Sequence, residues 1–127
     1  MQEIANHFHK HGKTVLQFGP DKSYYDRDPF VPLENAVHIR GLSVRQLAAC
    51  YAVIGKMISG DTGDYHLMLA VGGETVTLVP HESFQLGYVY SDLLYGYAAQ
   101  DWEDEKCRVH YLNHEDYKAI IAGRVFL

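Results

Sequence analysis

The residues best suited to nucleophilic chemistry in this sequence are Cys50 and His66. The thiolate is the reactive form of cysteine, and an imidazole within hydrogen-bond reach can take up its proton. Apolar residues recur at three- and four-residue steps through residues 44–59, which predicts a long helix that is capped by Ser43 and carries Cys50. Residues 66–71 are almost continuously apolar, which predicts a buried strand that opens with His66.

A cysteine on a helix followed by a histidine at the start of an apolar strand is similar to the arrangement in transglutaminase-like cysteine hydrolases. The resemblance implies a hydrolase in which Cys50 is the nucleophile and His66 is its partner. However, Cys50 lies about two turns into the predicted helix, whereas a reactive thiol is favoured near a helix N-terminus. Residues 59–65 leave no room for an intervening strand, and Val79 and Pro80 stand where the third, acidic residue belongs. We therefore expect Cys50 to be a packed thiol, with the hydrolase as an alternative function.

Three histidines, His7, His9 and His11, alternate with other residues near the N-terminus. On a helix, His7 and His11 lie one turn apart, a spacing that can bind a transition metal. Structural metal sites usually have four ligands, however, and the sequence has no C-x-x-C or H-E-x-x-H pattern. The sequence therefore favours a solvated terminal helix, with no metal and no cofactor.

The glycines and acidic residues of residues 60–64 form a second pattern that is compatible with a ligand site. This segment lacks the length and the terminal glutamate of a calcium loop. The glycine-rich motifs that bind phosphate are also missing from the sequence. We therefore interpret residues 60–64 as a turn.

Two segments combine aromatic and acidic residues and are candidates for recognition of a protein partner. Aromatic anchors surrounded by charge suit a protein interface, particularly with a partner that has a basic surface. The alternative is a pair of solvated loops whose rings pack back onto the core, and the sequence leaves both interpretations open. The expected binding residues are Tyr24, Tyr25, Asp26, Asp28, Phe30, Trp102, Glu103, Asp104 and Glu105.

Composition limits the class of protein. The chain has 127 residues and a net charge of −5, which suits one domain over residues 1–127 and disfavours a nucleic-acid partner. No apolar run is long enough to cross a bilayer, and the N-terminus does not resemble a secretory signal. The two cysteines are too few for a disulfide framework, so we expect reduced thiols and a cytoplasmic location. Ten tyrosines suit strands that cover a sheet, or a pocket lined by their hydroxyls.

The order of elements predicts an α+β fold. Helices are expected at residues 2–11, 44–59, 91–99 and 114–122, and strands at residues 14–18, 36–39, 66–71, 75–79, 84–90, 107–112 and 124–127. We expect a single layer of mostly antiparallel β-sheet, packed by the central helix and flanked by short N- and C-terminal helices. Glycines 72 and 73 are expected to form the tight turn of a β-hairpin, with the strand of residues 75–79 exposing one face. Asn113 is expected to cap the last helix. The predicted core includes Leu47, Ile54, Leu69 and Leu78.

These observations favour a small, acidic, non-enzymatic module that acts through protein–protein contacts. A regulatory, immunity or phage counter-defence inhibitor is the kind of protein expected. The cysteine-dependent hydrolase that uses Cys50 and His66 is the alternative. A small-ligand-binding protein with a tyrosine-lined pocket is the third possibility.

Overall fold

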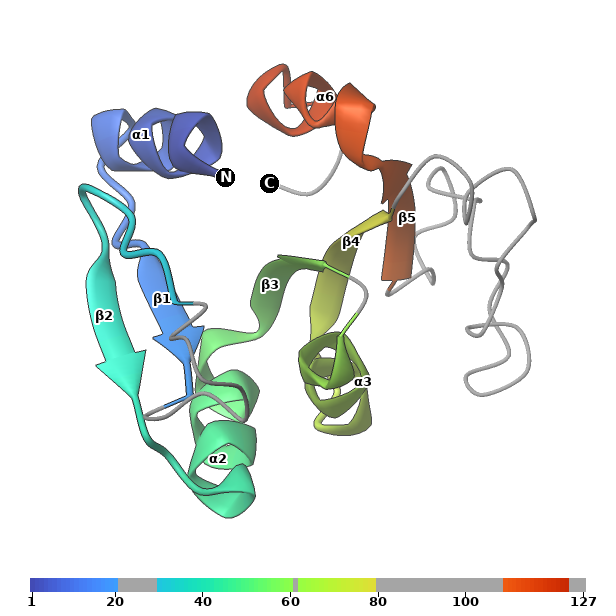
Figure 1. Ribbon diagram of the computed structural model, residues 1–127. Helices are drawn as coiled ribbons and strands as arrows, with labels where there is room; N and C mark the ends of the chain where they lie inside the picture. Colours follow the sequence, from blue (N-terminus) through green and yellow to red (C-terminus); the bar gives the residue numbers. More distant parts are fainter. Residues whose placement is uncertain (21–29, 61, 80–108, 124–127) are drawn as a thin grey trace. The chain divides into compact units, whose positions relative to one another are not determined.

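A computed structural model describes residues 1–20, 30–60, 62–79 and 109–123 of the chain (Figure 1). These residues divide into two compact units, residues 1–47 and residues 48–127, with the boundary inside helix α2 (Val44–Ile54). Within the described ranges, no helix has the length and apolar character that crossing a membrane requires.

The first unit contains helix α1 (Gln2–Lys10) and a two-stranded sheet of β1 (Leu16–Gly19) and β2 (Val37–Arg40). The two strands are parallel, with Leu16 opposite Val37. The helix and both strands were predicted close to these positions. Helix α1 ends before Gly12, whose φ of 73° lies in the left-handed region that favours glycine.

Helix α2 begins where the sequence predicts and ends earlier. The Ser43 hydroxyl accepts from the Gln46 N–H at 3.3 Å, and the Gln46 side chain accepts from the Ser43 N–H at 2.9 Å, which is a reciprocal capping arrangement. The predicted continuation to residue 59 is wrong, because Gly55 takes a φ of 75° and stops the helix. The following residues form strand β3 (Lys56–Gly60) instead.

The second unit contains a β–α–β unit made of β3, α3 (Gly63–Ala70) and β4 (Glu74–Val79). Strand β5 (Val109–Asn113) extends the sheet in the order β3-β4-β5, and every pairing is parallel (Figure 1). The prediction of a single, mostly antiparallel sheet is therefore wrong. The described residues hold two small sheets of two and three strands, both entirely parallel, together with four α-helices.

The predicted strand of residues 66–71 is also wrong, since these residues belong mainly to helix α3. A short, continuous apolar run is compatible with a buried strand or a buried helix, and periodicity alone does not separate the two. The glycines at 72 and 73 terminate the helix rather than turning a hairpin. Gly72 has a φ of 90°, and the N–H groups of Gly72 and Gly73 donate to the carbonyls of Leu69 and Met68, both at 3.0 Å.

The core of the second unit lies where α2, α3 and the three-stranded sheet contribute buried side chains. Leu69 is buried as predicted, although it reaches the core from a helix. The predicted wet face of β4 is wrong, because Thr75, Val76 and Thr77 are all buried, and their side chains alternate between the two faces of a strand that is paired on both edges. Leu47, Ile54 and Leu78 are half-buried rather than fully buried. The largest fully buried side chains among the described residues are Tyr51, Tyr65, Met68, Leu69, Thr75, Val76, Thr77 and Ile120.

At the C-terminal end, the predicted helix cap is confirmed. The Asn113 side chain accepts from the Glu115 N–H at 3.2 Å and starts a short 3-10 turn (His114–Asp116), which leads into α6 (Lys118–Ile121). The remaining predicted elements, at residues 84–90, 91–99 and 124–127, lie outside the described residues.

Candidate functional site

The loop of residues 60–64 joins β3 to α3 and lies at the carboxyl end of β3. In open parallel sheets, ligands bind outside the carboxyl ends of the strands. Gly60 ends the strand and Gly63 begins the helix. A Cβ atom at either glycine would meet no heavy atom of the described residues within 4 Å. Neither glycine therefore places a side chain between its own backbone and an approaching ligand.

The N-terminus of α3 adds hydrogen-bond donors to the loop. The first N–H groups of a helix have no partner within the helix, and the helix dipole makes this end favourable for negative charge. Thr62 is the residue before the helix and has extended backbone, but its side chain makes no capping hydrogen bond to the helix. Instead, the Thr62 hydroxyl donates to Asp64 Oδ2 at 3.3 Å. The amides of the first turn are therefore not capped by Thr62.

A hydrogen bond from Tyr51 holds the Asp64 side chain in place. The Tyr51 hydroxyl donates to Asp64 Oδ1 at 2.9 Å, and the Tyr51 side chain is 0% exposed. Burial raises the pKa of the Tyr51 hydroxyl above its ordinary value, and the hydrogen bond and negative charge of Asp64 raise it further. Tyr51 therefore stays protonated and acts as a donor to the carboxylate, so both oxygens of Asp64 accept a hydrogen bond.

Hydroxyl groups also line one face of the sheet near the same loop. Thr75 and Thr77 are buried neighbours on β4 whose hydroxyl oxygens lie 3.3 Å apart. Ser59 of β3 is opposite Thr77 in the register, one residue before Gly60. The Ser59 Oγ atom is buried and has no hydrogen-bond partner among the described residues. A buried polar atom of this kind is normally satisfied by a water molecule or a ligand.

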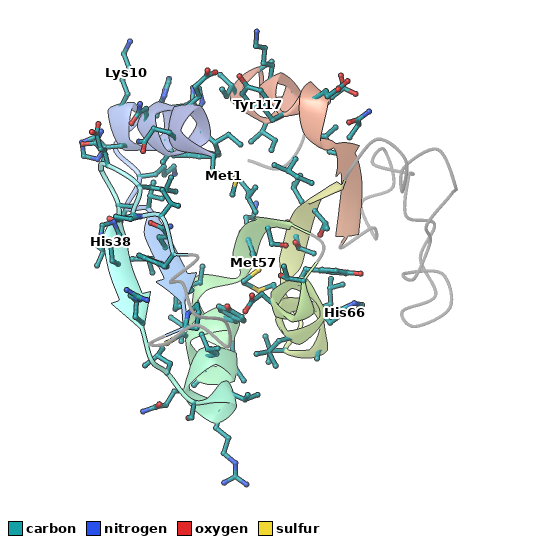
Figure 2. All side chains as sticks on the ribbon, in the orientation of Figure 1. Met1, Lys10, His38, Met57, His66 and Tyr117 are labelled. Carbon is teal, nitrogen blue, oxygen red and sulfur yellow. The ribbon has the colours of Figure 1, made fainter. Side chains whose placement is uncertain are left out.

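Cys50 and His66, the pair with nucleophilic potential, lie on two different helices. Cys50 is a half-buried free thiol in α2. His66 is in α3 (Figure 2). Its ring lies against the Tyr65 ring with a centroid separation of 3.9 Å. The resemblance to cysteine hydrolases required a histidine at the start of a strand. Because residues 63–70 are helical, that arrangement is not present here.

Only one of the predicted partner-binding residues, Phe30, belongs to the described part of the chain. Its ring is half-buried and contacts neighbours from the first unit: the Arg40 guanidinium lies 4.4 Å from the ring centroid, and the His38 ring meets it edge-on at 5.8 Å. The other predicted residues lie outside the described residues: Tyr24, Tyr25, Asp26, Asp28, Trp102, Glu103, Asp104 and Glu105.

Sequence reasoning missed the arrangement of Ser59, Tyr51 and Asp64 around the loop. The sequence pattern places Tyr51 only in the apolar stripe of the predicted helix, and Asp64 in the predicted turn. The signal that could have revealed the loop was Gly55, because a glycine inside an apolar helical pattern often marks the C-terminal end of the helix. Ending the helix there would have left residues 56–60 to form a strand before a glycine-containing loop.

The chain was compared with protein families, curated proteins and solved structures. No family model, no curated protein and no solved structure matches it.

Proposed function

We propose that this chain binds an organic phosphate that carries free hydroxyl groups, such as a sugar phosphate or a nucleotide, at the loop of residues 60–64. One observation carries the proposal. A loop with glycines at both ends, Gly60 and Gly63, connects a parallel strand to the N-terminus of α3, and no heavy atom that the structure describes lies within 4 Å of either glycine's Cβ position. This is the position at which parallel α/β folds bind ligands.

The N-terminus of α3 supports recognition of the phosphate group. Backbone N–H groups at a helix start donate to phosphate oxygens, and the helix dipole favours the negative charge. A glycine at position 63 lets a phosphate approach these amides without a side chain in the way. The Thr62 hydroxyl, at the edge of the same turn, is a further hydrogen-bonding group.

Asp64 supports recognition of hydroxyl groups rather than of phosphate. A carboxylate has about four acceptor positions, and hydrogen bonds from Tyr51 and Thr62 occupy two of them. Its negative charge repels a phosphate and accepts hydrogen bonds from sugar hydroxyls. A ligand that carries both a phosphate and hydroxyl groups can bind both parts of the site. Its phosphate accepts hydrogen bonds from the helix amides, and its hydroxyls donate to Asp64.

Binding can be tested by thermal and chemical unfolding of the full chain with ADP, glucose 1-phosphate, inorganic phosphate or glucose. A ligand that binds only the native state stabilises it by about 2.7 kcal/mol at one hundred times its Kd. We expect ADP or glucose 1-phosphate to stabilise the protein most, inorganic phosphate less and glucose least.

The decisive variant is Gly63→Val, with Ala70→Val as its matched control. A side chain at position 63 has room in the protein but blocks the helix amides, whereas Ala70 is exposed at the other end of the same helix. Gly63→Val should abolish binding and keep the fold, and Ala70→Val should bind normally. Asp64→Asn should move the preference toward inorganic phosphate. Unchanged binding by Gly63→Val, or no stabilisation by any of the phosphates, would overturn the proposal.

This function belongs to the same class as the small-ligand-binding protein considered from sequence, with a glycine-containing loop in place of a tyrosine-lined pocket. The hypothesis of a protein partner with a basic surface stays a prediction. Of its expected contact residues, Phe30 alone lies in the described part of the chain.

A further inference from the structure

His7 and His11 lie side by side at the C-terminal end of α1. Residues four apart on a helix are neighbours on its surface, and the centroids of these two rings are 4.3 Å apart, with their planes tilted by 38°. His11 is exposed and His7 is half-buried. Both imidazole rings are therefore brought to one surface position of the first unit.

A hydrogen bond to the backbone sets the tautomer of His11. Its Nδ1 atom lies 2.7 Å from the carbonyl oxygen of His7. A carbonyl oxygen can only accept, so Nδ1 carries the hydrogen, and in the neutral ring the lone pair is on Nε2. Histidines that bind metals almost always donate their other ring N–H to a carbonyl or carboxylate in this way, which orients the ring and makes the ligating nitrogen more basic.

We propose that His7 and His11 form a chelate for a divalent late transition-metal ion, with Cu²⁺ bound more tightly than Ni²⁺ or Zn²⁺. Imidazole nitrogen suits all three ions, and divalent metals follow this order of affinity at most nitrogen sites. Metal–nitrogen bonds of about 2.0–2.1 Å let one ion bridge two adjacent ring edges. The described residues contain no group of three or more metal-ligating side chains, so water completes the coordination.

His9 provides a matched control on the same helix. It lies two residues from each member of the pair, and residues two apart on a helix do not face each other. His9→Ala therefore removes one exposed imidazole and leaves the chelate intact. Far-UV circular dichroism of every variant checks that α1 is still formed.

The experiment is calorimetric titration of the full chain with Cu²⁺, Ni²⁺, Zn²⁺ or Mg²⁺. We expect His7→Ala and His11→Ala each to lower Cu²⁺ affinity by about tenfold or more. The double variant should lose less than the two single losses combined, because either substitution alone already destroys the chelate. His9→Ala should bind as the wild type does, and Mg²⁺ should not bind.

Several further outcomes decide the proposal. In proton NMR spectra, substoichiometric Cu²⁺ should broaden the ring signals of His7 and His11 before those of the other histidines. An equal loss of affinity in His9→Ala, or unchanged affinity in the double variant, overturns the chelate. Additive losses in the two single variants also overturn it, since they would indicate independent ligands.

Discussion

Replacing Tyr51 with phenylalanine removes one hydroxyl from a fully buried side chain and leaves its ring in the core. In the native protein that hydroxyl donates to Asp64 Oδ1 at 2.9 Å. Hydrogen bonds that involve a charged group contribute about 1.5–3 kcal/mol to stability. Tyr51→Phe should therefore lower the free energy of unfolding at pH 7 by about this amount.

The same substitution should change how stability depends on alkaline pH. Burial and Asp64 raise the pKa of Tyr51 above its ordinary value of 10.0. Above pH 10 the unfolded chain loses the Tyr51 proton while the native protein keeps it, so the native state binds more protons and stability falls as pH rises. This residue contributes a loss of up to about 1.4 kcal/mol per pH unit. Phenylalanine has no such proton, so the advantage of the wild type over Tyr51→Phe should shrink above pH 10.

Urea denaturation followed by far-UV circular dichroism, at several pH values from 7 to 11, measures both effects. The other tyrosines are common to the two proteins, so their titration cancels in the difference between the unfolding free energies. If the unfolding free energies of the two proteins fall with urea concentration at equal slopes, their denatured states are comparable. If the two proteins are equally stable at pH 7, or if their difference is constant through pH 11, the Tyr51–Asp64 hydrogen bond does not have the role described.

Three further substitutions test the packing of the second unit. Gly73→Ala places a Cβ atom against the Met68 sulfur and a backbone carbonyl, so urea denaturation should show a loss of about 1–3 kcal/mol from overpacking; Gly60→Ala, whose Cβ has open space, is the control and should cost much less. Leu69→Ala removes a side chain that is 2% exposed and should cost about 2–5 kcal/mol; an unchanged melting temperature would contradict its place in the core. Cys50→Ala should cost about 1 kcal/mol and leave phosphate binding intact, and loss of binding without loss of stability would restore a functional role for this thiol.

The sequence by itself determined the features that depend on neighbouring residues. Ser43 caps α2 and Asn113 caps the last helical segment, as predicted, because a cap is a hydrogen bond between a side chain and an amide two or three residues away. The helix end before Gly12 is of the same kind, since only glycine readily adopts the left-handed backbone there. Strands near residues 16–19 and 37–40 could also be predicted from their local composition.

Tertiary structure alone decided the direction of strand pairing and the nature of residues 63–70. An apolar run of this length can be buried as a strand or as a helix, and the choice depends on what covers it. Once Gly55 ends α2 and residues 56–60 become a strand, residues 63–70 become the crossover helix that a parallel pair requires, and the antiparallel hairpin is lost. The hydrogen bond from Tyr51 to Asp64 spans two helices that only this arrangement brings together. Local patterns cannot specify such a contact, because it depends on free energy gained only when distant segments pack.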